Sequence, residues 1–226
     1  ACPDTLSCPA GGGPPVDRCC SPAMGLLVFV QQWYPKLGPS DAFTLHGLWP
    51  DECNGDQGPR NGCDSRRNYP NLGRIIKNAD PDLYTSMTTF WPSYKKNVEL
   101  FWSHEWNKHG TCVSTLEPQC LSETAEPHTD VLVYFRTALA LREQFNPYKV
   151  LADKNIVPGN LYDRELITTT LQEAWGVPVR ITCRRGQINE IWLWMKVRGR
   201  DHYIATPPVK PSKAQECGSS IYYPPK

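Results

Sequence analysis

Residues Gly25 to Trp33 read GLLVFVQQW. The stretch is short, apolar and bounded by turn-forming residues, which is typical of a buried β-strand. Strand patterns recur late in the chain, and we predict strands at Val179 to Cys183, Glu190 to Val197 and Tyr203 to Thr206. A sheet is therefore expected.

Helices are predicted between the first strand and the later ones, at Pro81 to Trp91, Leu100 to Lys108, Thr129 to Phe145 and about Asp163 to Trp175. Asp80 is placed to cap the first helix, and Gly176 is placed to end the last. Strands and helices mix without regular βαβ alternation, so we predict an α+β fold with a central, mainly antiparallel sheet and flanking helices. The 226 residues show no repeat and no linker, which favours a single domain.

The two ends of the chain and one long loop are irregular in composition. The predicted segments are a disulfide-stapled arm at 1–22, a loop at 51–69 closed by Cys53 and Cys63, and a Pro- and Lys-rich tail at 207–226 held by Cys217. No apolar run approaches 18 residues, so no membrane span is expected.

The chain contains ten cysteines. No CxxC is matched with another CxxC or an HxxxH to form a zinc ligand set, so disulfides are favoured over a metal site. Disulfides persist in secretory and extracellular compartments. The start of the chain, Ala1-Cys2-Pro3, lacks the basic and apolar regions of a signal peptide, and we expect that one has been removed. We therefore predict a secreted, extracellular protein, or one in a vacuolar or lysosomal type of compartment. The residues alone leave the cysteine pairing open.

Two of the five histidines lie close together in FWSHEWNKHGTC (Phe101 to Cys112). On a helix with 100° per residue, His104 neighbours Lys108 and Glu105 neighbours His109, each pair at i,i+4. These four side chains span an arc of about 140°, and two tryptophans of the segment point the other way. One face therefore concentrates two imidazoles, a carboxylate and an ammonium.

Two simpler interpretations of this segment compete with a catalytic one. Most charged helix faces are solvated surfaces, but here histidine is scarce and the segment is flanked by aromatic residues and held at Cys112. A zinc protease motif needs histidines at i and i+4 around a glutamate, whereas Lys108 occupies i+4 and His109 comes one residue late. A lysine between the ligands would repel Zn²⁺, so we expect no metal and no cofactor.

A third histidine, His46, lies in FTLHGLWP (Phe43 to Pro50). We predict a strand-like start and a turn at Gly47, with His46 at its mouth beside an exposed Trp49. A lone histidine is more often structural. Together, however, the two segments supply what phosphodiester transfer through a ribose 2′-hydroxyl needs, since one imidazole can remove the 2′ proton and another can protonate the 5′-oxygen. The groups available to stabilise the extra charge of the transition state are His104, Lys108 and Glu105.

FTLHGLWP and FWSHEWNKHGTC resemble, almost letter for letter, the two active-site segments of the ribonuclease T2 family. The resemblance covers nearly the whole chain, including the cysteine positions, GLLVFVQQW and VRGRD (Val197 to Asp201), and it looks closest to secreted fungal members. It implies an α+β endoribonuclease, independent of metals, that cleaves single-stranded RNA with little base specificity through a 2′,3′-cyclic phosphate. The implied catalytic residues are His46, Glu105 and His109, with His104 and Lys108 contacting the phosphate and the transition state.

The resemblance also implies a disulfide pairing. Its five bridges are Cys2–Cys20, Cys8–Cys53, Cys19–Cys120, Cys63–Cys112 and Cys183–Cys217. The fourth bridge would clamp the catalytic helix to the loop that follows His46.

Two base sites are implied as well. At the first, Trp49 would stack on a base and Asp51 would accept from an amino group, while Gln57 stands where fungal relatives commonly carry a tyrosine. The second comprises Gln32, Pro92, Ser93 and Phe101, next to Tyr94 and Lys95, which are specific to this chain. The simpler interpretation of Trp49 and Phe101 is core packing, because aromatic residues are usually buried.

The main competing function is a non-catalytic secreted protein on the same fold, such as a defence or storage protein. Such a protein could lose either histidine, whereas this chain keeps the whole set. His128 and His202 lie in surface-like stretches and are expected to be structural. The net charge of +1 lacks the basic excess that long duplex nucleic acid demands. We therefore expect a monomer that holds a few nucleotides of single-stranded RNA and no membrane.

Overall fold

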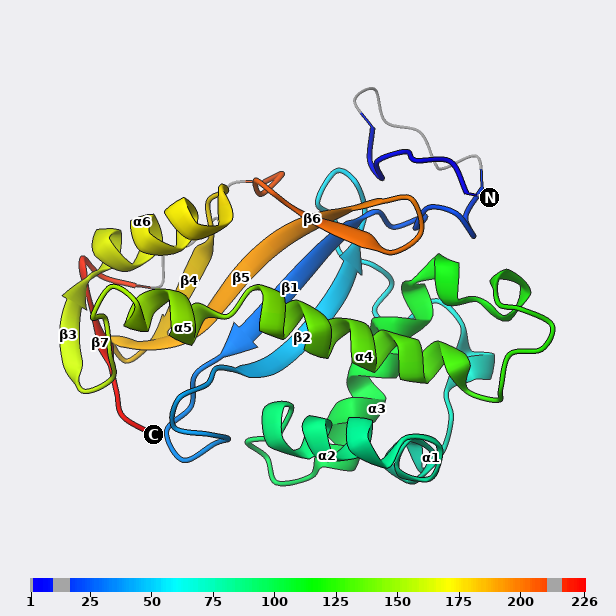
Figure 1. Ribbon diagram of the computed structural model, residues 1–226, viewed down its shortest axis with the longest axis horizontal. Helices are drawn as coiled ribbons and strands as arrows, with labels where there is room; N and C mark the ends of the chain where they lie inside the picture. Colours follow the sequence, from blue (N-terminus) through cyan, green and yellow to red (C-terminus); the bar gives the residue numbers. More distant parts are fainter. Residues whose placement is uncertain (1, 10–16, 211–216) are drawn as a thin grey trace.

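The computed structural model describes residues 2–9, 17–210 and 217–226, and a seven-stranded sheet forms its centre (Figure 1). The strands are β1 (Leu26–Gln32), β2 (Thr44–Asp51), β3 (Asn160–Asp163), β4 (Arg180–Arg184), β5 (Gln187–Arg198), β6 (His202–Thr206) and β7 (Ser220–Tyr223). Their order is β2-β1-β5-β7-β3, and β4 and β6 also pair with β5. Among the described pairings only that of β5 with β7 is parallel. The predicted α+β fold with a mainly antiparallel sheet is confirmed.

β1 is buried along its whole length, as its apolar sequence predicts. It pairs with β2 on one side and with β5 on the other. β5 alternates apolar residues such as Leu193 and Met195 with partly exposed ones, because only one of its faces meets the larger hydrophobic core. The opposite face carries Glu190, Trp192 and Trp194, and from it Glu190 and Trp192 reach His46 and Trp49 of β2.

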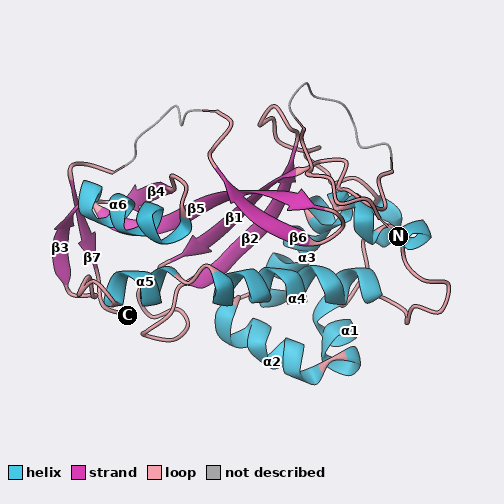
Figure 2. Ribbon diagram, turned by 45° about the horizontal axis from the view of Figure 1, so that its top comes forward, coloured by secondary structure: helices cyan, strands magenta, loops and turns pink. Residues whose placement is uncertain are grey.

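Helices pack around this sheet (Figure 2). They are α1 (Leu72–Ala79), α2 (Pro81–Phe90), α3 (Val98–Lys108), α4 (Thr129–Gln144), α5 (Pro147–Ala152) and α6 (Arg164–Trp175). Side chains from α1 to α4 share the larger core with β1, β2 and β5, while α5 and α6 enclose a second core with β4, β5 and β7. Short 3₁₀ turns include Ser65–Arg67 and Gly110–Cys112.

The four predicted helices are present, with ends that differ by one or two residues. The Asp80 side chain accepts from the Leu83 amide at 2.9 Å, and Gly176 ends α6 in a left-handed conformation, as expected. α3 starts earlier than predicted because Asn97 caps it by accepting from the Leu100 amide at 3.0 Å. Helices α1 and α5 and strands β3 and β7 were not predicted.

The ends of the chain differ in part from the sequence-based expectation. Residues 220–223 lie in the predicted tail but form β7, because Ile221 and Tyr223 are buried in the second core. The predicted Pro- and Lys-rich tail therefore contains a strand that its sequence did not indicate. Parts of the predicted arm and tail, residues 1, 10–16 and 211–216, lie outside the described residues.

The predicted turn at Gly47 is also wrong, because β2 continues through Gly47 to Asp51. Val30 pairs with Gly47 and the next residue, Gln31, pairs with Leu45, which leaves His46 as an extra residue between two paired ones. This is a β-bulge, a distortion that re-aims a side chain without ending the strand. His46 thus leaves the regular alternation of β2.

All ten cysteines form disulfides, and their pairing is the one implied by the resemblance: Cys2–Cys20, Cys8–Cys53, Cys19–Cys120, Cys63–Cys112 and Cys183–Cys217. Among the described residues, no helix is both long enough and apolar enough to cross a membrane.

Candidate active site

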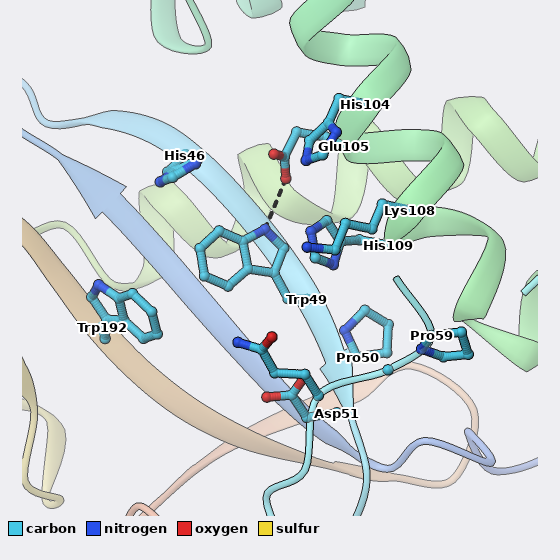
Figure 3. Close-up of a pocket in the computed structure, with 12 residues that line it drawn as sticks. His46, Trp49, Pro50, Asp51, Pro59, His104, Glu105, Lys108, His109 and Trp192 are labelled. Carbon is cyan, nitrogen blue, oxygen red and sulfur yellow. Dashed lines mark hydrogen bonds between the residues drawn. The ribbon is translucent and has the colours of Figure 1, made fainter. Parts of the chain in front are cut away.

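A cavity of about 270 Å³ opens where α3 meets β2 and β5, and the two sequence motifs meet in it (Figure 3). The residues that line it are His46, Trp49, Pro50, Asp51, Gln57, Gly58, Pro59, His104, Glu105, Lys108, His109 and Trp192. The structure therefore brings together all five predicted catalytic and phosphate-contacting residues and all three residues of the first base site.

Two buried tryptophans hold α3 against the rest of the molecule. The Trp102 indole donates to the Trp91 carbonyl at 2.8 Å, and the Trp106 indole donates to the Arg67 carbonyl at 2.7 Å. Both bonds satisfy buried N–H groups that would otherwise be costly. The opposite face of the helix is thereby fixed toward the cavity.

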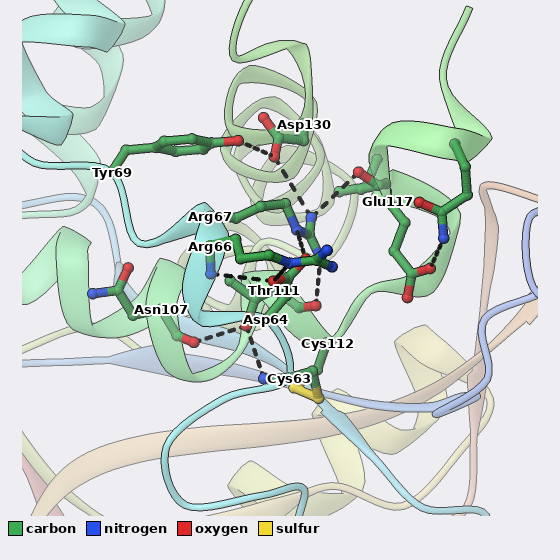
Figure 4. A network of polar contacts seen from close by, with 12 residues as sticks. Cys63, Asp64, Arg66, Arg67, Tyr69, Asn107, Thr111, Cys112, Glu117 and Asp130 are labelled. Atoms are coloured by element: carbon green, nitrogen blue, oxygen red, sulfur yellow. Dashed lines mark hydrogen bonds and ion pairs between the residues drawn. A yellow bond between two sulfur atoms is a disulfide. The ribbon is translucent and has the colours of Figure 1, made fainter.

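A buried polar network holds the segment just after His109 (Figure 4). The Arg67 guanidinium is 3% exposed, donates to the Thr111 carbonyl at 2.6 Å and lies 3.5 Å from an Asp130 carboxylate oxygen. The Thr111 hydroxyl accepts from the Cys63 amide at 3.1 Å, beside the Cys63–Cys112 disulfide. Covalent and polar links therefore both tie the end of α3 to the loop that follows β2.

Trp49 and Glu105 form the centre of the cavity wall. The Trp49 indole donates to Glu105 Oε2 at 2.8 Å, and Glu105 is only 1% exposed. Gly47 leaves the room for this bond, since a Cβ at that position would lie 2.1 Å from Trp49 Nε1 and 2.2 Å from Glu105 Oε2. Burial raises the pKa of Glu105 to about 7, although His46 and the indole bond favour its ionised form.

His46 is held on both sides. Its Nδ1 lies 2.6 Å from Glu190 Oε1, and its carbonyl accepts from the Trp91 indole at 3.0 Å. Burial opposes a charge on the His46 imidazole, but the hydrogen bond to Glu190 and the nearby charges of Glu105 and Glu190 outweigh it, so the pKa of His46 is raised.

His109 has the opposite environment. It lies directly after α3, with its ring stacked on Trp49 at 5.2 Å between centroids, and the His104 ring is 6.0 Å away. Burial, together with the charges of Lys108, His104 and His46, lowers the pKa of His109 to about 2. In Figure 3, Trp49 lies between His46 and Trp192 on one side and Lys108 and His109 on the other.

Asp51 and Gln57 form the far wall of the cavity, and their backbones pair as an isolated bridge. The Gly58 amide donates to the Asp51 carboxylate, but burial prevails and raises the pKa of Asp51 to about 6. The carboxylate can therefore change its protonation state under mildly acidic conditions.

The residues predicted for the second base site do not line this cavity. The Phe101 ring is 5.8 Å from the His46 ring. Gln32 is buried and its amide donates to the Leu45 carbonyl at 3.1 Å, while the Ser93 hydroxyl accepts from the Lys95 amide at 3.2 Å. Pro92, which precedes Ser93, is partly exposed.

One group of side chains in the cavity has donor atoms close enough to hold a metal ion. Ligand atoms of His104, Glu105 and His109 lie within 4.8 Å of one another. Lys108 lines the same cavity, and its ammonium opposes a bound cation. The geometry thus permits a metal that the local charge disfavours.

Two residues of the site were missed at the sequence level, Glu190 and Trp192 of β5. Glu190 binds His46, and the Trp192 ring meets the Trp49 ring edge-on at 5.2 Å. A signal was available, because Glu190 is the only carboxylate in the predicted strand Glu190 to Val197, which is apolar apart from Glu190 and Lys196. His128 packs against Tyr69 and His202 is exposed at the start of β6, so neither joins the cavity.

Comparison with known proteins places these residues in a family context. The model of the ribonuclease T2 family matches residues 24–213. Ribonuclease Rh of Rhizopus niveus is 43% identical over 93% of this chain and 87% of its own length, and ribonuclease T2 of Aspergillus oryzae is 37% identical over 93% and 78%. The crystal structure of Actibind, described as a T2 ribonuclease, superposes with a TM-score of 0.88 at 33% identity over 99% of this chain and 96% of that one. RNase NT in complex with 5′-AMP superposes with a TM-score of 0.69 at 29% identity, over 89% and 98%.

Proposed function

The chain belongs to the ribonuclease T2 family of endoribonucleases, and we propose that it cleaves single-stranded RNA by metal-independent transphosphorylation, with His46 and His109 as the acid–base pair. The observation that carries this proposal is the opposite pKa shift of two histidines that both contact the Trp49 ring.

The shifts distinguish the roles of the two imidazoles. His109, with its pKa lowered to about 2, is neutral and able to accept the 2′-hydroxyl proton. His46, with its pKa raised, carries the proton that the 5′-oxygen needs when it leaves. The 2′-oxygen forms a bond to phosphorus as the bond from phosphorus to the 5′-oxygen breaks, which yields a 2′,3′-cyclic phosphate. His109 ends protonated and His46 neutral.

The remaining polar groups of the cavity stabilise the charge on phosphorus-bound oxygens. Lys108 supplies a full positive charge, and His104 supplies a ring N–H. Glu105 has a pKa of about 7, so at acidic pH its carboxyl group is neutral and can donate a hydrogen bond to a phosphoryl oxygen. A catalytic optimum on the acidic side of neutral follows from these roles.

Base recognition is proposed at Trp49, Asp51 and Gln57. Stacking on an aromatic ring is worth about 1–3 kcal/mol per base and tolerates every base. An ionised Asp51 favours an exocyclic amino donor, so adenine is preferred over uracil. Gln57 offers an amide in place of a second ring, which makes the preference modest. The second base site is proposed at Gln32, Pro92, Ser93 and Phe101.

Secretion is proposed from the disulfides. Five bridges, one of them beside the catalytic helix, require an oxidising compartment to persist.

The test is incubation of the protein with yeast RNA, and separately with a dinucleoside monophosphate, in excess EDTA. We expect unchanged turnover and products that end in 2′,3′-cyclic phosphate. Activity that disappears with EDTA and returns with Zn²⁺ or Mg²⁺ would refute the mechanism, and absence of cleavage under every condition would support the non-catalytic alternative.

A further inference from the structure

Glu190 lies outside both active-site motifs, yet it contacts His46 directly. It belongs to β5, and its pairing partners are Gln32 of β1 and Thr182 of β4. The bulge in β2 moves His46 out of regular alternation, and its Nδ1 comes within 2.6 Å of Glu190 Oε1. The side chains are 12% and 32% exposed for Glu190 and His46, so water screens this contact only in part.

We propose that Glu190 is a positioning residue that fixes the orientation and the protonation of His46. This inference rests on the proposed role of His46 as the acid. A carboxylate on Nδ1 selects the tautomer in which Nδ1 carries a proton and Nε2 faces the cavity, which is the role that a buried aspartate has in hydrolase triads. The same carboxylate stabilises the imidazolium before the proton is transferred.

Glu190 is itself fixed by its surroundings. Its second oxygen, Oε2, accepts from the Trp192 indole at 3.0 Å, and Trp192 in turn contacts the Trp49 ring. The Arg180 guanidinium lies 4.8 Å from the centre of the Trp192 ring. Burial disfavours the Glu190 carboxylate, but the hydrogen bond and charge of His46, the indole and Arg180 prevail, so the pKa of Glu190 is lowered.

His46 faces two carboxylates, an ammonium and the rings of His104 and His109, whose protonated forms also oppose a charge on His46. Glu190 and Glu105 favour the imidazolium, whereas Lys108 opposes it. Among these, only Glu190 forms a hydrogen bond to the ring. Removing the charge of Glu190 should therefore make His46 lose its proton at a lower pH, with the rest of the cavity intact.

The test compares Glu190→Gln with the native enzyme on one dinucleoside monophosphate across pH 4 to 9. We expect the alkaline limb of kcat/KM to move to lower pH. The loss at pH 7.5 should be about 10- to 100-fold, the range typical of outer carboxylates that orient a metal-bound imidazole, and should fall on kcat with KM within about twofold. At lower pH, where His46 regains its proton in the variant, part of the activity should return.

Two further variants separate position from charge and from general damage. Glu190→Asp keeps the charge, so the alkaline limb should stay near its native pH while kcat falls. Glu173→Gln, at an exposed position on α6, is the matched control, and it should change neither the alkaline limb nor kcat. NMR titration of His46 gives the same comparison without turnover, and its midpoint should be lower in Glu190→Gln than in the native protein.

The inference would be overturned if Glu190→Gln left both the alkaline limb of kcat/KM and the titration midpoint of His46 at their native pH. A loss of kcat that is equal at every pH would also overturn it. The proposed function fails in a different way. If His46→Ala retains native turnover, His46 is not the acid, whatever Glu190 does.

Discussion

The surroundings of His46 and His109 differ in the charges that face two chemically identical rings. His46 emerges from a bulge in a strand and meets a carboxylate, whereas His109 follows the last turn of a helix and meets a lysine and a second histidine. The pKa of His46 is raised and that of His109 is lowered to about 2. The comparison shows that partners, and not residue type, decide which imidazole can give a proton and which can take one.

The largest expected effect comes from removing either ring. His46→Ala or His109→Ala should lower kcat/KM by about 10²- to 10⁴-fold, because each supplies one half of the proton transfer. The double variant should lose little more than the worse single one, since the two act as a unit. Dinucleotide cleavage assays on the three variants check this, and additive losses would mean that the rings work independently.

The next largest loss of activity is expected from a substitution at Gly47, beside the hydrogen bond that joins Trp49 of β2 to Glu105 of α3. Gly47→Ala would place a Cβ against Trp49 Nε1 and Glu105 Oε2, so the bond that joins the strand to the helix should break. A shift of about 1 Å in such a site costs roughly 100-fold in rate, and we expect a loss of 10- to 100-fold.

Gly218→Ala is the control for this variant, because its added Cβ would meet nothing nearer than 3.9 Å. Circular dichroism and thermal melting show whether Gly47→Ala stays folded. A folded Gly47→Ala enzyme with native turnover would show that the Trp49–Glu105 contact does not matter for the chemistry.

The variant Lys108→Gln tests how far a nearby positive charge controls the protonation of His109. Lys108 is one of the charges that hold the pKa of His109 low. Its removal should raise that pKa, so the base becomes protonated at a higher pH and the acid limb of kcat/KM moves upward. We expect this together with a loss of about tenfold or more in kcat, measured as a pH profile. An acid limb that does not move would place the controlling group elsewhere.

The features of the fold and of the site that could be predicted from sequence are those set by residues close together in the chain. Features set by contacts between distant segments could not be predicted. GLLVFVQQW is a short apolar run and the residues around His104 to His109 have helical spacing, so both are local patterns, and the structure contains both elements. The bulge at His46 could not be predicted, because it arises from the register between β1 and β2. Glu190 was missed because it reaches the site through strand pairing across 144 positions of sequence, and α1 and β7 are set by packing that no local pattern records.

The smallest predicted effect concerns base choice and leaves the histidines unchanged. Burial raises the pKa of Asp51 to about 6, so Asp51 is an ionised acceptor above that pH and a neutral group below it. The preference for adenine over uracil should therefore weaken by a few-fold as the pH falls from 7 to 5. Competition between the two dinucleotides measures this, and Asp51→Asn should abolish the pH dependence. A ratio that is constant with pH would exclude Asp51 from base recognition.

The difference in protonation between the two imidazoles can be measured directly. In the free native enzyme labelled at histidine, an NMR titration from pH 3 to 9 follows both rings, with His46→Ala and His109→Ala used to assign the signals. We predict that His46 titrates above the ordinary imidazole value of 6.5 and that His109 remains neutral throughout the range. If the midpoints were equal, or if His109 titrated at the higher pH, the assignment of acid and base would be contradicted.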